Sequence, residues 1–172
     1  GLITWLYGDF IMLLRNQVMP YEKVQGTSSK IMEKWRKRLT DQIRHNKGLT
    51  RSAIRENFYA IAKDYARVPV QRISKPRVGI VGELYVKYAD FGNDHLLDFL
   101  VEQGAEVMVP GILGFALYSL NIGMENNRLY GDKKGVMFSR LAVAYVESLE
   151  KTMLGVLRDF PQFRKPVPFP EL

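Results

Sequence analysis

Four polar side chains follow a predicted buried strand and could line a ligand cleft. Residues 75 to 86 read KPRVGIVGELYV, and the polar stretch that begins there contains Glu83, Tyr85, Asn93 and His95. In open α/β sheets, ligands bind outside the carboxyl ends of parallel strands, which is where this stretch would lie. A carboxylate such as Glu83 can accept a hydrogen bond from a substrate hydroxyl, or act as a base if burial raises its pKa. All four are candidate cleft residues, and a capping or surface role is the alternative for His95.

Two glycines in the same stretch raise the question of a nucleotide site. A dinucleotide site needs G-x-G-x-x-G at the turn from strand to helix, and a P-loop needs G-x-x-x-x-G-K-[ST]. The sequence GIVGE has neither pattern. Gly79 lies inside the strand, where glycine favours close packing, and Gly82 lies where the chain turns. The sequence therefore predicts no glycine-rich phosphate loop.

The residue types that usually hold metals are scarce. The chain contains no cysteine, so these residues cannot form a disulfide, a thiolate zinc site or a cysteine-held iron–sulfur cluster. The two histidines, His45 and His95, lie far apart in the sequence and lack the spacing of metal ligands. We predict no metal site in this chain.

The positive charge is concentrated in one segment. The net charge is +7, and residues 30 to 72 contain twelve Lys or Arg against four Asp or Glu, so the rest of the chain is nearly neutral. Arg36, Lys37 and Arg38 form the densest cluster. They can be the solvated face of a helix, or a surface that binds an anion or a partner. Nucleic acid is not favoured, because no zinc-finger, RNA-recognition or helix-turn-helix pattern accompanies them.

The hydrophobic pattern predicts an α/β fold with a helix-rich N-terminal part, residues 1–74, and an α/β subdomain, residues 75–172. Apolar residues recur at helical spacing on both sides of HNKG, residues 45–48, and predict two amphipathic helices with Trp35 in the core. Trp5 is also expected in the core.

The run 107–124 is long and uncharged, but Pro110 breaks it, so we do not expect a membrane helix.

The second part predicts a strand–helix–strand unit, whose crossover should be right-handed. The predicted elements are a strand at 77–81, a polar loop at 85–93, a helix from Leu96 to Gly104, a strand at 105–110, helices at 112–122 and 137–157 with a loop at 126–135, and an extended proline-rich tail at 161–172. This order is typical of a Rossmann-like or flavodoxin-like parallel sheet with flanking helices.

Residues 75–110, KPRVGIVGELYVKYADFGNDHLLDFLVEQGAEVMVP, with FALYSL at 115–120 and PYE at 20–22, resemble the 2-hydroxyglutaryl-CoA dehydratase and CoA-substrate-specific enzyme activase family. The resemblance implies a cytoplasmic, oxygen-sensitive system of anaerobic bacteria. In it, an ATPase component passes one electron to a dehydratase, which eliminates water from a 2-hydroxyacyl-CoA. The family's dehydratase parts are built from Rossmann-like or flavodoxin-like subdomains and hold an iron–sulfur cluster through cysteines.

This chain departs from the family pattern because it has no cysteine and no phosphate loop. The resemblance therefore implies an internal α/β subdomain that contributes scaffold or cleft, while the cluster and ATP belong to other parts of the system. Its implied partners are other domains of a parent chain, and acyl-CoA. Two alternatives stay open: a stand-alone α/β module that binds a small molecule or nucleotide, and an interaction domain that uses the basic surface.

If the basic helix binds the phosphates of CoA, the binding should be weak and sensitive to salt. Replacing Arg36, Lys37 and Arg38 together with Gln should then lower the affinity for CoA thioesters, measured by titration calorimetry at two salt concentrations. An unchanged affinity would remove this hypothesis.

Overall fold

The computed structural model describes residues 1–71 and 73–166. Its N-terminal part contains α1 (Leu2–Val18), the short 3-10 helix η1 (Met19–Tyr21), α2 (Thr27–Arg44) and α3 (Arg51–Ala66). The two amphipathic helices predicted around residues 45–48 are confirmed as α2 and α3. The Thr50 side chain accepts a hydrogen bond from the backbone N–H of Ala53 and so caps the start of α3. Gly48, with φ +75°, supplies the left-handed backbone that the turn between them needs.

A strand–helix–strand unit follows, as predicted. It consists of β1 (Arg77–Gly79), α4 (Leu84–Tyr88), α5 (Asp90–Asn93), α6 (Leu96–Glu102) and β2 (Glu106–Met108). The strands pair in parallel, with Arg77 opposite Glu106 and Gly79 opposite Met108. Gly104, with φ +87°, follows the end of α6 and turns the chain back into β2. The described residues therefore form a helix-rich α/β fold whose sheet has two parallel strands.

The predicted polar loop at 85–93 is wrong, because α4 and α5 occupy this segment. The Glu83 carboxylate accepts hydrogen bonds from the backbone N–H groups of Tyr85 and Val86. Free N–H groups at a helix start are costly unless a side chain accepts them, so this cap stabilises a helical turn in a sequence without strong periodicity.

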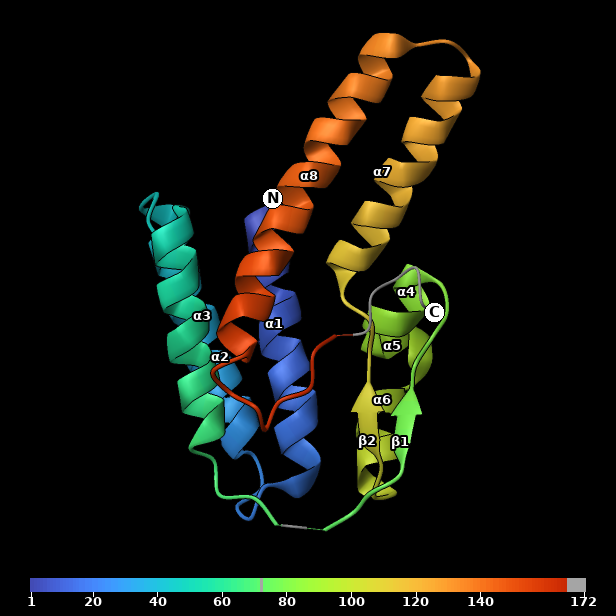
Figure 1. The fold of residues 1–172 in the computed structure, drawn as a ribbon. Coiled ribbons are helices and arrows are strands. Elements are labelled where there is room, and N and C mark those ends of the chain that lie inside the picture. The colour runs from blue at the N-terminus through green and yellow to red at the C-terminus, as the bar shows by residue number, and fades with distance from the viewer. Residues whose placement is uncertain (72, 167–172) are drawn as a thin grey trace.

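The helices α7 (Ile112–Leu129) and α8 (Lys133–Leu157) form a long antiparallel hairpin that extends beyond the rest of the molecule (Figure 1). Both are longer than predicted, and the predicted loop at 126–135 shrinks to residues 130–132. The Asp132 side chain explains the early start of α8, since it accepts a hydrogen bond from the Gly135 N–H. The predicted tail begins with a turn at 161–163, and its residues 167–172 lie outside the described part.

One large hydrophobic core holds the helices together. It is built from α1, α2, α3 and the second half of α8, with Leu113 at the start of α7 and two phenylalanines after α8. Residues on both sides of position 74 therefore share one core. A smaller cluster, Ile80, Val107 and Val109, packs α6 against the strands. Figure 1 shows α1 standing between the helical layer and the two strands.

The two tryptophans have different environments. Trp35 is 1% exposed and donates a hydrogen bond from Nε1 to the Asp64 carboxylate at 2.9 Å, so its predicted core position is confirmed. The same prediction for Trp5 is wrong, because its side chain is 45% exposed. The buried face of α1 carries Leu6, Phe10 and Leu14 instead, and Trp5 lies beside this stripe.

The two tryptophans make a matched pair of stability probes. Trp35→Ala should lower the free energy of unfolding by about 3–5 kcal/mol, because it leaves a cavity and removes the indole hydrogen bond to Asp64. Trp5→Ala should cost only about 1 kcal/mol, since half of its side chain is already in water. Urea unfolding followed by circular dichroism measures both, and equal losses would contradict the different burial.

Candidate functional site

The four predicted cleft residues lie around α4 and α5, and the polar side-chain atoms of Glu83 and Asn93 bond the local backbone. Glu83 caps α4, as described above. Asn93 donates from Nδ2 to the Val86 carbonyl at 2.8 Å and accepts from the Leu96 N–H at 3.3 Å. Tyr85 is 59% exposed. His95 is exposed immediately before α6, with φ 55° and no capping hydrogen bond from its side chain. None of the four lines either of the two cavities described below.

The cations of the basic cluster are exposed and partly neutralised by local partners. Arg36 donates two hydrogen bonds to the Glu33 carboxylate, both at 2.7 Å, and Lys37 lies 3.6 Å from the same carboxylate. The Arg36 hydrogen bonds are the main reason that the pKa of Glu33 falls to about 2. The Arg38 guanidinium lies over the ring of Trp35, 4.8 Å from its centre.

The basic helix lies far from the sheet. α2 is on the opposite side of α1 from β1 and β2 (Figure 1). The structure therefore does not bring Arg36, Lys37 and Arg38 together with the predicted cleft residues. Binding of CoA phosphates to this surface stays a prediction.

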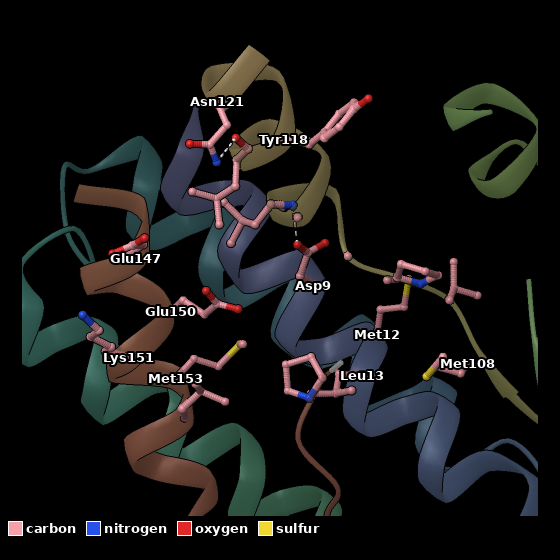
Figure 2. Close-up of a pocket in the computed structure, with 18 residues that line it drawn as sticks. Asp9, Met12, Leu13, Met108, Tyr118, Asn121, Glu147, Glu150, Lys151 and Met153 are labelled. Atoms are coloured by element: carbon pink, nitrogen blue, oxygen red, sulfur yellow. Dashed lines mark hydrogen bonds between the residues drawn. The ribbon is translucent and has the colours of Figure 1, made fainter. Parts of the chain in front are cut away.

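A cavity of about 450 Å³ lies among α1, α7, α8 and the segment that follows β2 (Figure 2). Its lining is mostly apolar, and includes Met12, Leu13, Met108, Leu117, Met153 and Leu154. We call the hollow lined by these side chains the acyl cavity. Met108 ends β2 and the residues after it form one wall, so the acyl cavity opens at the carboxyl end of a parallel strand.

Asp9 fixes the upper wall of the acyl cavity. Its carboxylate accepts hydrogen bonds from the backbone N–H groups of Ile112 at 2.9 Å and Leu113 at 2.8 Å, the first two residues of α7. Burial raises the pKa of Asp9, and these two hydrogen bonds and the charge of Lys87 oppose the rise. A Cβ atom at Gly111 would lie 2.5 Å from Asp9 Oδ2, so the close approach requires glycine there.

Two further carboxylates and one ammonium lie on the α8 side of the acyl cavity: Glu147, Glu150 and Lys151. Figure 2 shows Glu150 extending from α8 toward α1. Burial first, and then the charge of Glu147, raise the pKa of Glu150. When Asp9, Glu147, Glu150 and Lys151 are all ionised, the net charge on the lining is −2. A ligand in this cavity is thus expected to be apolar and without negative charge.

A second cavity, of about 430 Å³, lies over the two strands, β1 and β2. It is lined by polar and charged residues that include Gln17, Arg77, Glu106, Arg164 and Lys165. Glu106 is 5% exposed, accepts a hydrogen bond from the Tyr21 hydroxyl at 2.8 Å, and pairs with the Arg164 guanidinium. We call it the basic cavity, because its lining carries a charge of +2 when these groups are ionised.

Gln17 anchors the chain that borders the basic cavity. Its Nε2 donates to the Arg164 carbonyl at 3.1 Å, and its Oε1 accepts from the Arg164 N–H at 2.8 Å. The segment after α8 is therefore held against α1 and β2 by both main chain and side chain. Both cavities combine residues of α1 with residues that follow β2 or lie near the end of the described chain. No sequence pattern pointed to these residues as a site. The only local signal was the i, i+3 spacing of Glu147 and Glu150.

In the described part of the chain, no three His, Cys, Asp or Glu side chains come together as a metal site would require. The chain has no cysteine, so its residues do not fit the iron–sulfur cluster that the family resemblance implies. The helices within residues 1–71 and 73–166 are not long and apolar enough to cross a membrane.

We found no protein-family model, no curated protein and no solved structure that matches this chain. The geometry of the two cavities and the motifs between residues 75 and 120 are therefore the features that bear on function.

The raised pKa of Glu150 predicts a pH-dependent effect of Glu150→Gln. Below the ordinary pKa of glutamate the carboxyl is neutral in both folded and unfolded chains, so variant and wild type should be equally stable near pH 4. As the pH rises through the higher folded pKa, wild type loses stability and the variant does not. We expect the variant to be the more stable protein at pH 7 in urea unfolding. A stability difference that is the same at both pH values would contradict the raised pKa.

Proposed function

We propose that this chain is an α/β subdomain of a 2-hydroxyacyl-CoA dehydratase or of its activase-like relative. In this role it contributes the cleft wall that receives the acyl group of a CoA thioester. The observation that supports the proposal most is the position of the acyl cavity at the carboxyl end of β2. Segments with the family-like motifs, from β1 to the first half of α7, supply the strand end and one wall of this cavity.

The chemistry of the parent enzyme would lie outside these residues. With no cysteine and no glycine-rich phosphate loop, this chain supplies neither cluster ligands nor an ATP site. Its part would be to exclude water from the acyl group and to orient it, which are the usual contributions of a mostly apolar cavity. The partners in this proposal are other domains of a cytoplasmic parent protein.

The finer fold assignment belongs to the same proposal. Parallel strands joined by helices are the repeating unit of Rossmann-like and flavodoxin-like sheets. We propose that β1 and β2 are two strands of such a sheet, and that further strands come from elsewhere in the parent protein.

A second candidate function is a stand-alone module that binds a small apolar molecule. The volume of the acyl cavity favours it, since about 300–1,000 Å³ is typical of small-molecule sites. Such a module would bind the uncharged methyl ester of a 2-hydroxy acid as well as the corresponding CoA thioester, whereas a dehydratase subdomain should prefer the thioester.

Filling the acyl cavity tests the proposal. Leu154 lines it from α8 and is only partly buried, so Leu154→Trp should reduce the free volume at a modest cost in stability. We expect this variant to bind a medium-chain 2-hydroxyacyl-CoA about 10-fold more weakly or worse in titration calorimetry, because the acyl group loses its buried contacts.

The control is Leu129→Trp, which enlarges an exposed residue at the end of α7 and should leave the affinity unchanged. Thermal unfolding confirms that both variants are folded. Absence of thioester binding by the wild-type chain would reject the dehydratase assignment, and equal binding of the uncharged methyl ester would favour the second candidate.

A further inference from the structure

The first half of α8 displays an apolar row that the described part of the chain leaves largely in water. Phe138, Leu141 and Tyr145 follow one another at spacings of three and four residues, so they lie on one face of the helix. Their side chains are 72%, 65% and 45% exposed. Single exposed apolar side chains are ordinary, but a row of three on one helix face is typical of an interaction site. We call these three residues the α8 stripe.

The same face of α8 is covered further along the helix. Its spacing continues to Ser148 and Thr152, where the second half of α8 packs on α3. α3 begins at Arg51, whose guanidinium donates a hydrogen bond to the Ser148 hydroxyl at 2.7 Å. Figure 1 shows the first half of α8 continuing well beyond this end of α3. The α8 stripe is therefore the continuation of a helix-packing face beyond the point where α3 stops covering it.

The charges beside the α8 stripe are all positive. Lys133, Lys134 and Arg140 are exposed, and residues 133 to 146 include no Asp or Glu. Two copies of the stripe packed on each other would bring these cations together, and like charges across an interface are costly. A surface that covers the stripe should therefore combine an apolar side chain with carboxylates.

The outer face of α6 has this composition. Glu102 lies one helical turn after both Asp98 and Phe99, so the three side chains share a face, and all three are exposed. The opposite face of α6 packs on the smaller hydrophobic cluster beside the strands. Residues 88 to 104 include no Lys or Arg, and within the described ranges no ion pair neutralises Asp98 or Glu102. We call these three residues the α6 face.

A single copy cannot close this contact on itself. The first half of α8 lies in the projecting hairpin, whereas α6 lies beside β1 and β2, away from that end of the molecule (Figure 1). A contact between the two surfaces therefore joins different copies. Each pair that forms keeps one unused α8 stripe and one unused α6 face.

We propose that this chain associates with itself head to tail, with the α8 stripe of one copy packed on the α6 face of the next. Phe99 contacts the stripe, and the carboxylates beside it face the cations that accompany the stripe. Because such a contact is not closed by a two-fold axis, further copies can add at both ends. The contact uses neither cavity, so it is independent of the proposed function.

The contact is small, so the association should be weak, with a dissociation constant of about 10–100 µM. Sedimentation velocity over a range of concentrations measures it. Species larger than a dimer should appear at the highest concentrations. Raising the salt from about 0.05 to 0.5 M should weaken the association several-fold, because the ion pairs at its edge are screened.

Two double variants each damage one of the surfaces. Phe138→Gln with Leu141→Gln removes the apolar contact of the α8 stripe, and Asp98→Lys with Glu102→Lys reverses the charge of the α6 face. All four side chains are exposed, so both variants should fold, which thermal unfolding checks. Each variant alone should associate at least about 10-fold more weakly than wild type.

A mixture of the two variants gives the sharpest test. The intact α8 stripe of one variant can pack on the intact α6 face of the other, so association should return to about the wild-type strength. It should stop at a heterodimer of one copy of each variant, because the two remaining surfaces are damaged. A contact with two-fold symmetry would not give this result.

The matched control is Val24→Gln with Ile73→Gln, which replaces two exposed apolar residues outside both surfaces and should associate as wild type does. A wild-type chain that stays monomeric at about 200 µM and low salt overturns the inference. A mixture that forms no heterodimer also overturns it. So does wild-type association by either surface variant, since the contact would then not use that surface.

Discussion

The hydrogen bonds from the start of α7 to Asp9 are the contact on which the rest of the site depends. A buried carboxylate is costly unless donors surround it, and here two backbone N–H groups and the positive end of the helix dipole stabilise it. This contact fixes the direction in which the chain leaves β2 and enters α7. Because α8 then returns to the core beside α1, the acyl cavity is enclosed by three helices and one strand end.

A second polar anchor lies beside the basic cavity. The Glu106 side chain on β2 is buried. Its carboxylate accepts a hydrogen bond from the Tyr21 hydroxyl and pairs with the Arg164 guanidinium. Gln17 holds the main chain of the same segment. These two anchors fix the chain segments that border the two cavities, whose linings carry opposite net charge when their side chains are ionised.

The sequence predicted most helices and both strands, because their signals are local. The four-residue spacing of apolar residues in α2 and the β-branched run before Gly82 each depend on neighbours in the chain. The errors have physical reasons too. The segment 84–88 is helical with the Glu83 side chain as its cap, and Trp5 is exposed because the buried stripe of α1 passes beside it. The sequence also showed the positive charge of α2, but it did not show that α1 separates α2 from the two strands.

The sequence by itself determined the chemical limits of this protein: no cysteine ligands, no glycine-rich phosphate loop, a basic N-terminal part and a strand–helix–strand unit. Only the tertiary structure decided where a ligand could bind. Asp9 and Glu150 come from opposite ends of the chain, as do Gln17 and Arg164, and no spacing rule relates residues so far apart. Their approach depends on the packing of α1 against α8 and the sheet, which is set by the whole core rather than by any local pattern.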